Sequence, residues 1–216
     1  MLEKMGEFFD ARLKGYDEHM LRDIELSRSF YPFTASCLPL AVGARVLDLG
    51  CGTGLELEEY FRLTGSAKVT GIDLAPGMLA ELKRKLVGYD VTVIQGSYFD
   101  LPFGEEIYDA AVSVESLHHF TKAAKVPLYR KLRASLKEYG YFVLTDYLAD
   151  SDDEERLHMD ELARLKLEQG ITDGEFYHYD TPLTVEHECE ALYEAGFSSV
   201  EVLKSWGHTH TVKAVK

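Results

Sequence analysis

The stretch VLDLGCGTGLE, residues 46–56, decides the fold of this chain. A short apolar run carries one acid, glycines follow at positions 50, 52 and 54, and a leucine–acid pattern then begins. This order predicts a buried strand, a tight turn and the first turn of a helix. Glycine at such a turn permits close approach of a ligand to the backbone. The stretch therefore predicts a ligand site at the carboxyl end of a strand.

The glycine spacing distinguishes between the common nucleotide-binding turns. A dinucleotide fingerprint has the form Gly-x-Gly-x-x-Gly, and its third glycine would fall at Leu55. A P-loop needs Gly-Lys followed by Ser or Thr, and no lysine follows this turn. The turn thus allows close approach of a ligand without the layout best suited to a pyrophosphate.

Two acids beside the turn indicate which ligand it receives. Asp73 ends the next predicted strand, 23 residues after Gly50, where a carboxylate can accept from both ribose hydroxyls. Asp48 lies inside an apolar strand, where an unpaired charge is costly. An acid in that place favours a ligand with cationic groups over a phosphate. S-adenosylmethionine fits, since it carries a sulfonium, an ammonium and a ribose but no phosphate.

Strands and helices alternate along the chain around this turn. Such alternation requires crossover connections and predicts a mostly parallel sheet with helices on both faces. The predicted strands are residues 44–50, 68–74, 91–96, 108–114 and 141–148, and the predicted helices between them are residues 55–64, 76–87 and 126–140, the last ended by Gly140.

The two ends of the chain have different patterns. Residues 1–40 are amphipathic and predict helices, with a break at Gly15 and a stop at Pro32. After residue 148 the sequence predicts a helix over 151–170 with Ser151 as its N-cap. A last helix over 184–197 and strands over 200–206 and 208–216 are predicted to follow.

Four segments resemble the successive motifs of class I S-adenosylmethionine-dependent methyltransferases: VLDLGCGTGLE, VTGIDLAPGMLAELKRK, VIQGSYFDLPF and YDAAVSVESLHHF. The resemblance covers about residues 40–148 closely. It implies an α/β, Rossmann-like fold, in which helices flank a seven-stranded, mostly parallel sheet. Residues 1–216 are then expected to form one domain: a helical lid (1–40), a cofactor-binding core (41–148), a helical cover inserted after strand five (149–183), and the last helix and strands (184–216).

The resemblance also implies roles for the residues around the turn. Gly50 and Gly52 would lie against the methionyl part of S-adenosylmethionine, and Asp48 would orient its ammonium. Asp73 would hold the ribose, and Glu115 would lie near the methyl-bearing end.

The adenine contacts are implied in the same way. Leu74 and Met78 would flank the ring, or else belong to the core. Many relatives have Gly-Asp where this chain has Gly-Ser at positions 96 and 97. Ser97 would accept from the adenine amino group more weakly than that Asp, or serve as a turn residue, and the Tyr98 amide would meet a ring nitrogen.

Methyl transfer from a sulfonium is an in-line displacement, in which the enzyme holds the nucleophile at near-attack distance in a dry pocket. His118 and His119 follow the fourth strand and are candidates for a general base. The alternative is that they pack or cap. Tyr16 of the lid would touch cofactor or substrate, or else be an aromatic on a helix face. Tyr147 and the aromatic stretch 177–179 would line the substrate side, or else be surface or core aromatics.

No metal site is predicted. His208 and His210 alternate on the final strand, but two histidines lack a third ligand there.

Composition limits the partners and the compartment. The net charge is −14, and residues 150–190 hold 14 acids against three bases, which disfavours nucleic acid. No apolar run approaches the roughly 20 residues of a membrane span. The three cysteines form no disulfide framework, and the charged N-terminus has no secretory pattern, so we expect a cytoplasmic protein. The sequence makes no prediction of oligomeric state.

The expected function is methyl transfer from S-adenosylmethionine to a small-molecule acceptor. Two alternatives use the same cofactor: a tRNA-modifying transferase that uses S-adenosylmethionine or a derivative, and a non-catalytic S-adenosylmethionine-binding protein. A nicotinamide reductase is disfavoured by Leu55.

Overall fold

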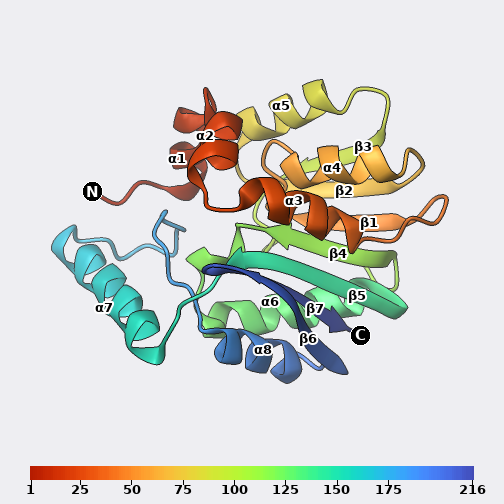
Figure 1. Cartoon of the computed structure of the whole chain (residues 1–216). Coiled ribbons are helices and arrows are strands. Elements are labelled where there is room, and N and C mark those ends of the chain that lie inside the picture. Colours follow the sequence, from red (N-terminus) through yellow and green to blue (C-terminus); the bar gives the residue numbers. More distant parts are fainter.

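A seven-stranded sheet forms the centre of the computed structural model, which describes residues 1–216 (Figure 1). The strand order is β3-β2-β1-β4-β5-β7-β6, and β7 alone runs in the direction opposite to the other six strands. The predicted mostly parallel sheet of seven strands is thereby confirmed. The strands are β1 Arg45–Leu49, β2 Lys68–Asp73, β3 Asp90–Gln95, β4 Tyr108–Val114, β5 Leu136–Tyr147, β6 Ser199–Trp206 and β7 Thr209–Val215.

Helices cover both faces of the sheet because its strands are apolar on both sides. In β1, Val46 packs in the core layer that includes α3, α4 and α5, whereas Leu47 and Leu49 pack in the layer that includes α6 and α8. The helices are α1 Met5–Arg12, α2 Tyr16–Asp23, α3 Ser27–Ser36, α4 Leu55–Leu63, α5 Pro76–Lys85, the 3₁₀ turn η1 Leu117–His119, α6 Lys122–Ser135, α7 Asp152–Glu168 and α8 Val185–Glu194.

The strand order reverses direction between β1 and β4, and this switch point sets the place of the site. The glycine turn follows β1, Asp73 ends β2, and Glu115 follows β4. Ligands of open α/β sheets bind beyond the carboxyl ends of the strands at such a point. Three of the predicted site segments therefore meet at one edge.

Two predicted helix ends are wrong. Gly140 lies inside β5 and does not end a helix, because α6 stops at Ser135 and Leu136 already pairs with Tyr108 of β4. A Cβ at Gly140 would lie 2.9 Å from the Lys137 carbonyl oxygen, so close backbone approach within the bent strand explains this glycine.

Pro32 does not stop the N-terminal helix either, since it lies inside α3. The buried side chains Phe30, Tyr31 and Thr34 hold α3 against the rest of the core. Tertiary packing of this face outweighs the backbone hydrogen bond that a proline cannot donate.

The N-terminal segment lies beside a segment that is distant in sequence. Lys4 and Tyr177 form an antiparallel bridge, in which Met5 N donates to Phe176 O and His178 N donates to Glu3 O, each at 2.9 Å. The predicted break at Gly15 separates α1 from α2.

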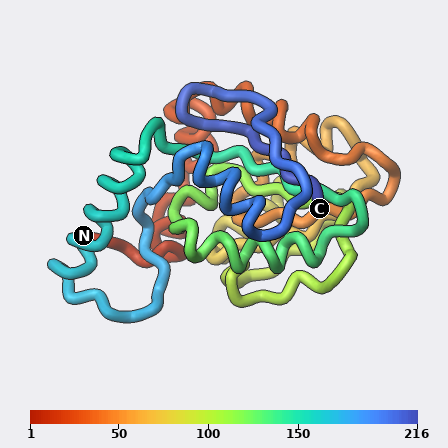
Figure 2. Tube along the Cα trace, turned by 90° about the horizontal axis from the view of Figure 1, so that it is seen from below, coloured from red at the N-terminus to blue at the C-terminus, as the bar shows by residue number.

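Helix α7 stands away from the sheet and has no buried residue (Figure 2). The Ser151 side chain accepts from Glu154 N at 3.2 Å, which confirms Ser151 as the N-cap. No helix of the structure combines the length and apolarity that crossing a membrane requires.

Candidate functional site

A cavity of about 50 Å³ lies at the glycine turn. Its walls come from the turn, from the ends of β2 and β4, and from the lid helices α1 and α2. It brings together seven of the predicted cofactor residues, namely Gly50, Gly52, Asp73, Leu74, Met78, Tyr98 and Glu115, with Tyr16 and His119 of the predicted catalytic residues.

Asp73 is fixed by backbone amides at the end of β2. Its Oδ2 accepts from Gly52 N at 2.9 Å, and its Oδ1 accepts from Ala75 N at 2.8 Å. Burial raises the pKa of Asp73, and the two amides partly oppose this shift. The carboxylate thus joins the first βα turn to the second, and each oxygen keeps a lone pair for a further donor.

Asp48 and Glu56 form a buried acidic pair behind the turn. The two carboxyls interact with each other, and no other group of the protein bonds to either Asp48 oxygen or to Glu56 Oε1. Burial raises the pKa of Asp48, and the charge of Glu56 raises it further; burial also raises the pKa of Glu56, to about 7. Orphaned acceptors beside a glycine turn fit a ligand that carries an ammonium group, as S-adenosylmethionine does.

The raised pKa of Glu56 predicts a pH-dependent effect of Glu56→Gln. In the unfolded chain Glu56 ionises near 4.5, whereas the folded protein holds the proton up to about pH 7. Ionisation of Glu56 therefore begins to lower the free energy of unfolding above pH 4.5, and the loss is complete above about pH 7. We expect Glu56→Gln to stabilise the cofactor-free protein by about 1–3 kcal/mol at about pH 8 and little at about pH 4. Urea denaturation at the two pH values tests this, and an equal change at both would contradict it.

Three of the four residues predicted to contact adenine line the cavity. Leu74 and Met78 both line it, and Met78 is almost fully buried. Tyr98 lines it too, with its hydroxyl 3.2 Å from Ser116 Oγ. Ser97 is not among the lining residues, and its Oγ accepts from Phe99 N at 3.1 Å. The geometry of Ser97 therefore favours the turn role, and its adenine contact stays a prediction.

The lid is bound to the cofactor-binding core by two of its acids. Asp17 of α2 accepts from Thr53 Oγ1 in the glycine turn and from Lys85 Nζ at 2.8 Å. Asp10 of α1 accepts from Gly77 N in the first turn of α5 at 2.8 Å. Polar contacts thus hold both lid helices over the cavity.

A larger cavity of about 870 Å³ adjoins the first. The two share Phe9, Tyr16, Glu115 and His119 as a common wall. Tyr147 and His178 line the larger cavity, as the sequence suggested, whereas Tyr177 and Tyr179 do not. The shared wall places this space next to the predicted methyl-bearing end of the cofactor.

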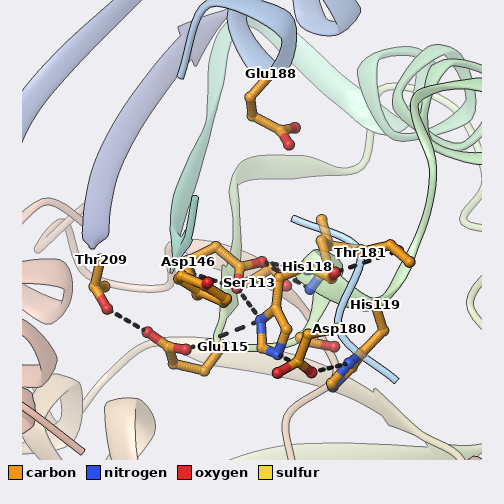
Figure 3. A network of polar contacts seen from close by, with 12 residues as sticks. Ser113, Glu115, His118, His119, Asp146, Asp180, Thr181, Glu188 and Thr209 are labelled. Carbon is orange, nitrogen blue, oxygen red and sulfur yellow. Dashed lines mark hydrogen bonds and ion pairs between the residues drawn. The ribbon is translucent and has the colours of Figure 1, made fainter. Parts of the chain in front are cut away.

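His118 is held by carboxylates in the wall of the larger cavity (Figure 3). Its Nδ1 lies 2.5 Å from Asp146 Oδ1, and Asp146 Oδ2 accepts from the backbone N–H of Leu117 at 2.7 Å and of His118 at 3.1 Å. Burial disfavours the charged ring, but the charges of Asp146, Asp180 and Glu115 outweigh it and raise the pKa of His118 to about 9.

His119, the next residue, has a pKa shifted in the opposite direction. Its Nδ1 lies 3.1 Å from Asp180 Oδ1, and its ring centroid is 4.0 Å from that of His118. Burial and the charge of His118 lower the pKa of His119 to about 4. Near neutral pH the pair therefore consists of one imidazolium and one neutral imidazole, and His119 is the better placed to accept a proton.

Glu115 lies between His118 and β7. Thr209 Oγ1 donates to Glu115 Oε1 at 2.9 Å (Figure 3). Burial and the charge of Asp146 raise the pKa of Glu115 to about 7. The residue follows β4 directly and lines both cavities, and its place near the methyl-bearing end stays a prediction.

Sequence reasoning missed Asp146 and Asp180. Asp146 is the single acid of the apolar run 141–148, which is the same signal that drew attention to Asp48. Asp180 had no such signal, because Asp-Thr-Pro reads as an ordinary turn, and only the fold brings it to the two histidines.

Comparisons with known proteins identify the family of this chain. A family model of a methyltransferase domain matches residues 46–140. Carboxy-S-adenosyl-L-methionine synthase of Wolinella succinogenes is 30% identical, over all of this chain and 95% of that protein. Sterol 24-C-methyltransferase ERG6B of Gibberella zeae is 26% identical, over 89% of this chain and 46% of that protein.

A solved structure shows the same fold at low identity. Human N-acetylserotonin methyltransferase, in complex with S-adenosylmethionine, matches with a TM-score of 0.64 and 20% identity, over 88% of this chain and 52% of that one. With the full-length bacterial relative and the matched family model, this establishes the assignment. The chain belongs to the class I S-adenosylmethionine-dependent methyltransferases, and it is an enzyme that uses S-adenosylmethionine.

Proposed function

We propose that the enzyme transfers the methyl group of S-adenosylmethionine to a small-molecule acceptor bound in the larger cavity. The observation that supports this most strongly is the wall shared by the two cavities, formed by Phe9, Tyr16, Glu115 and His119. A cofactor at the glycine turn then has its methyl-bearing end beside a space of about 870 Å³. That volume suits a small organic molecule.

The residues of the shared wall suit an in-line displacement. Phe9 and Tyr16 come from the lid and would exclude water from the reacting atoms, while Glu115 and His119 present polar atoms to the acceptor. Near-attack positioning in a dry site supplies most of the rate enhancement that such a reaction needs. In this proposal the chain's own residues orient the two reactants, and His119 is the candidate for receiving a proton.

Fractionated metabolite extracts and S-adenosylmethionine with a labelled methyl group test this function. We expect one fraction to yield a labelled small molecule together with S-adenosylhomocysteine. Tyr147→Ala changes the larger cavity only and should raise the KM for the acceptor without changing the affinity for S-adenosylhomocysteine. Cofactor binding without any labelled product would instead favour the non-catalytic alternative.

The ribose role of Asp73 predicts a loss of cofactor affinity in Asp73→Ala. Removal of a hydrogen bond to a charged group costs about 1.5–3 kcal/mol, which is about a 10- to 150-fold rise in Kd. Calorimetric titration with S-adenosylhomocysteine measures it. Asp90→Ala is the control, because Asp90 is an exposed acid at the start of β3. Equal affinity of both variants would remove Asp73 from the cofactor site.

A second candidate function follows from the full-length relative that makes carboxy-S-adenosyl-L-methionine. A carboxylate on the transferred carbon would lie near the acid Glu115, and the nearby cation His118 is already paired with Asp146, so these contacts favour methyl transfer. Mass spectrometry of the ligand that co-purifies with the enzyme separates the two. A carboxylated S-adenosylmethionine would favour the second function.

The proposed acceptor is not a nucleic acid, and the proposed compartment is the cytoplasm. Seven of the 14 acids of residues 150–190 lie on α7, which has no buried residue, and such a surface repels phosphate backbones. All three cysteines are free thiols, as a reducing compartment would keep them.

A further inference from the structure

His118, His119 and Asp180 place three metal-ligating atoms together in the wall of the larger cavity (Figure 3). We propose that these residues bind one divalent transition-metal ion of the zinc type. The ligand atoms all lie within 4.8 Å of one another. Two imidazoles and one carboxylate form a donor set that suits Zn²⁺, Fe²⁺, Co²⁺ or Ni²⁺ rather than Mg²⁺ or Ca²⁺.

The distances match those between neighbouring ligands of one ion. Asp180 Oδ1 lies 3.6 Å from His118 Nε2 and 3.1 Å from His119 Nδ1. Ligand bonds of about 2.0–2.2 Å at tetrahedral or octahedral angles put neighbouring donor atoms about 3.0–3.5 Å apart. The ligand atoms of the two histidines lie within 4.8 Å of each other, so binding of one ion would draw them together by up to about 1.5 Å.

Asp146 supplies the outer contact that such a histidine normally has. Asp146 Oδ1 lies 2.5 Å from His118 Nδ1, and two backbone amides fix Asp146 in place. The other ring nitrogen of His118, Nε2, is therefore directed to Asp180. A metal-bound imidazole usually donates its other N–H to a carboxylate, which fixes the ring and strengthens the ligand. This contact is already formed here.

The carboxylate ligand is also held in place. Thr181 N donates to His118 O at 2.7 Å, which anchors the segment that carries Asp180 to the 3₁₀ turn η1. The bridge between Lys4 and Tyr177 holds the same segment at its other end. The site is thus preorganised by contacts that do not involve the ligand atoms.

All three ligand residues line the larger cavity, which is the space proposed for the acceptor. A bound ion there would lower the pKa of an acceptor hydroxyl that coordinates it, and His119 would then serve as a metal ligand instead of as the proton acceptor. The sequence predicted no metal because only His208 and His210 suggested one, and they had no third ligand. The inference goes beyond the proposed function, and metal binding is measured without methyl transfer.

Titration of the chelator-treated full chain with Zn²⁺ in a calorimeter, and with Co²⁺ in a spectrophotometer, tests the site. We expect one equivalent of either ion to bind, with visible ligand-field bands for Co²⁺. Asp180→Asn should weaken Zn²⁺ binding by about 100-fold or more, since even an outer contact is worth 10- to 100-fold. Asp146→Asn should weaken it by about 10- to 100-fold.

His208→Ala is the matched control, because His208 lines the same cavity but pairs with Asp150 at 3.1 Å outside the cluster. It should bind Zn²⁺ like the parent chain. Affinity for S-adenosylhomocysteine verifies that Asp180→Asn is folded. The proposal is overturned if the parent chain binds no ion, if Asp180→Asn binds as tightly as the parent, or if His208→Ala is the variant that loses binding.

Discussion

Lys125→Met is expected to destabilise the protein by about 3–5 kcal/mol. Lys125 Nζ lies 2.5 Å from Glu188 Oε2, and both side chains are fully buried between α6 and α8. Tyr129 donates its hydroxyl to the other Glu188 oxygen. Without the lysine, the Glu188 charge stays buried with one neutral donor, which is far more costly than the loss of an exposed pair. Urea denaturation measures the change.

A second ion pair between α6 and α8 provides the control variant. Lys122 lies on α6 and pairs with Glu190 of α8 at 2.6 Å, but this pair is partly exposed. Lys122→Met should cost no more than about 1 kcal/mol. The double variant Lys125→Met with Glu188→Gln should recover part of the loss, because it removes the unpaired charge. Equal losses in the two single lysine variants would show that burial does not set the cost.

Gly50→Ala is expected to abolish measurable cofactor binding, with a loss of affinity of at least about 100-fold, or about 3 kcal/mol. Gly50 has φ of +75°, and a Cβ there would lie 2.0 Å from Ser116 Oγ and 2.6 Å from Ser116 Cβ. Ser116 follows Glu115 in the cavity wall, so its displacement disturbs both sides of the cofactor cavity. Titration with S-adenosylhomocysteine provides the measurement.

Gly43→Ala is the control that distinguishes backbone strain from a steric clash of the new Cβ. Its φ of +74° almost equals that of Gly50, yet a Cβ at Gly43 meets nothing within 4 Å. Gly43→Ala should therefore cost about 1–3 kcal/mol of stability from backbone strain, while the folded variant keeps its cofactor affinity. Ser116→Gly added to Gly50→Ala should restore binding in part. Retained affinity in Gly50→Ala alone would mean that Ser116 moves aside freely.

The sequence was informative where chemistry and local pattern coincide. Asp73 was predicted to end a strand beside the glycine turn, and it both ends β2 and accepts from Gly52 N. The strand over 108–114 was predicted with the bounds that β4 has. Apolar alternation and glycine spacing determine these features locally.

Other features depend on packing between distant segments. Pro32 lies inside a helix because of the core against which α3 packs, and Gly140 lies in a strand because β5 bends close to its own backbone. Asp180 reaches His119 across 61 positions of sequence only through the docking of its segment on the lid and on η1. No local pattern carries that information, so the histidine–carboxylate cluster appeared only in three dimensions.

The position of β7 between β5 and β6 imposes an order on folding. β6 has β7 as its one neighbour, so it joins the sheet only through a strand that follows it in the chain. The parallel strands β1 to β5 can pair earlier, which leaves one side of β5 as an unpaired edge until the final hairpin arrives. An open edge of this kind recruits other chains. Aggregation during refolding is therefore expected to depend on how fast that hairpin docks.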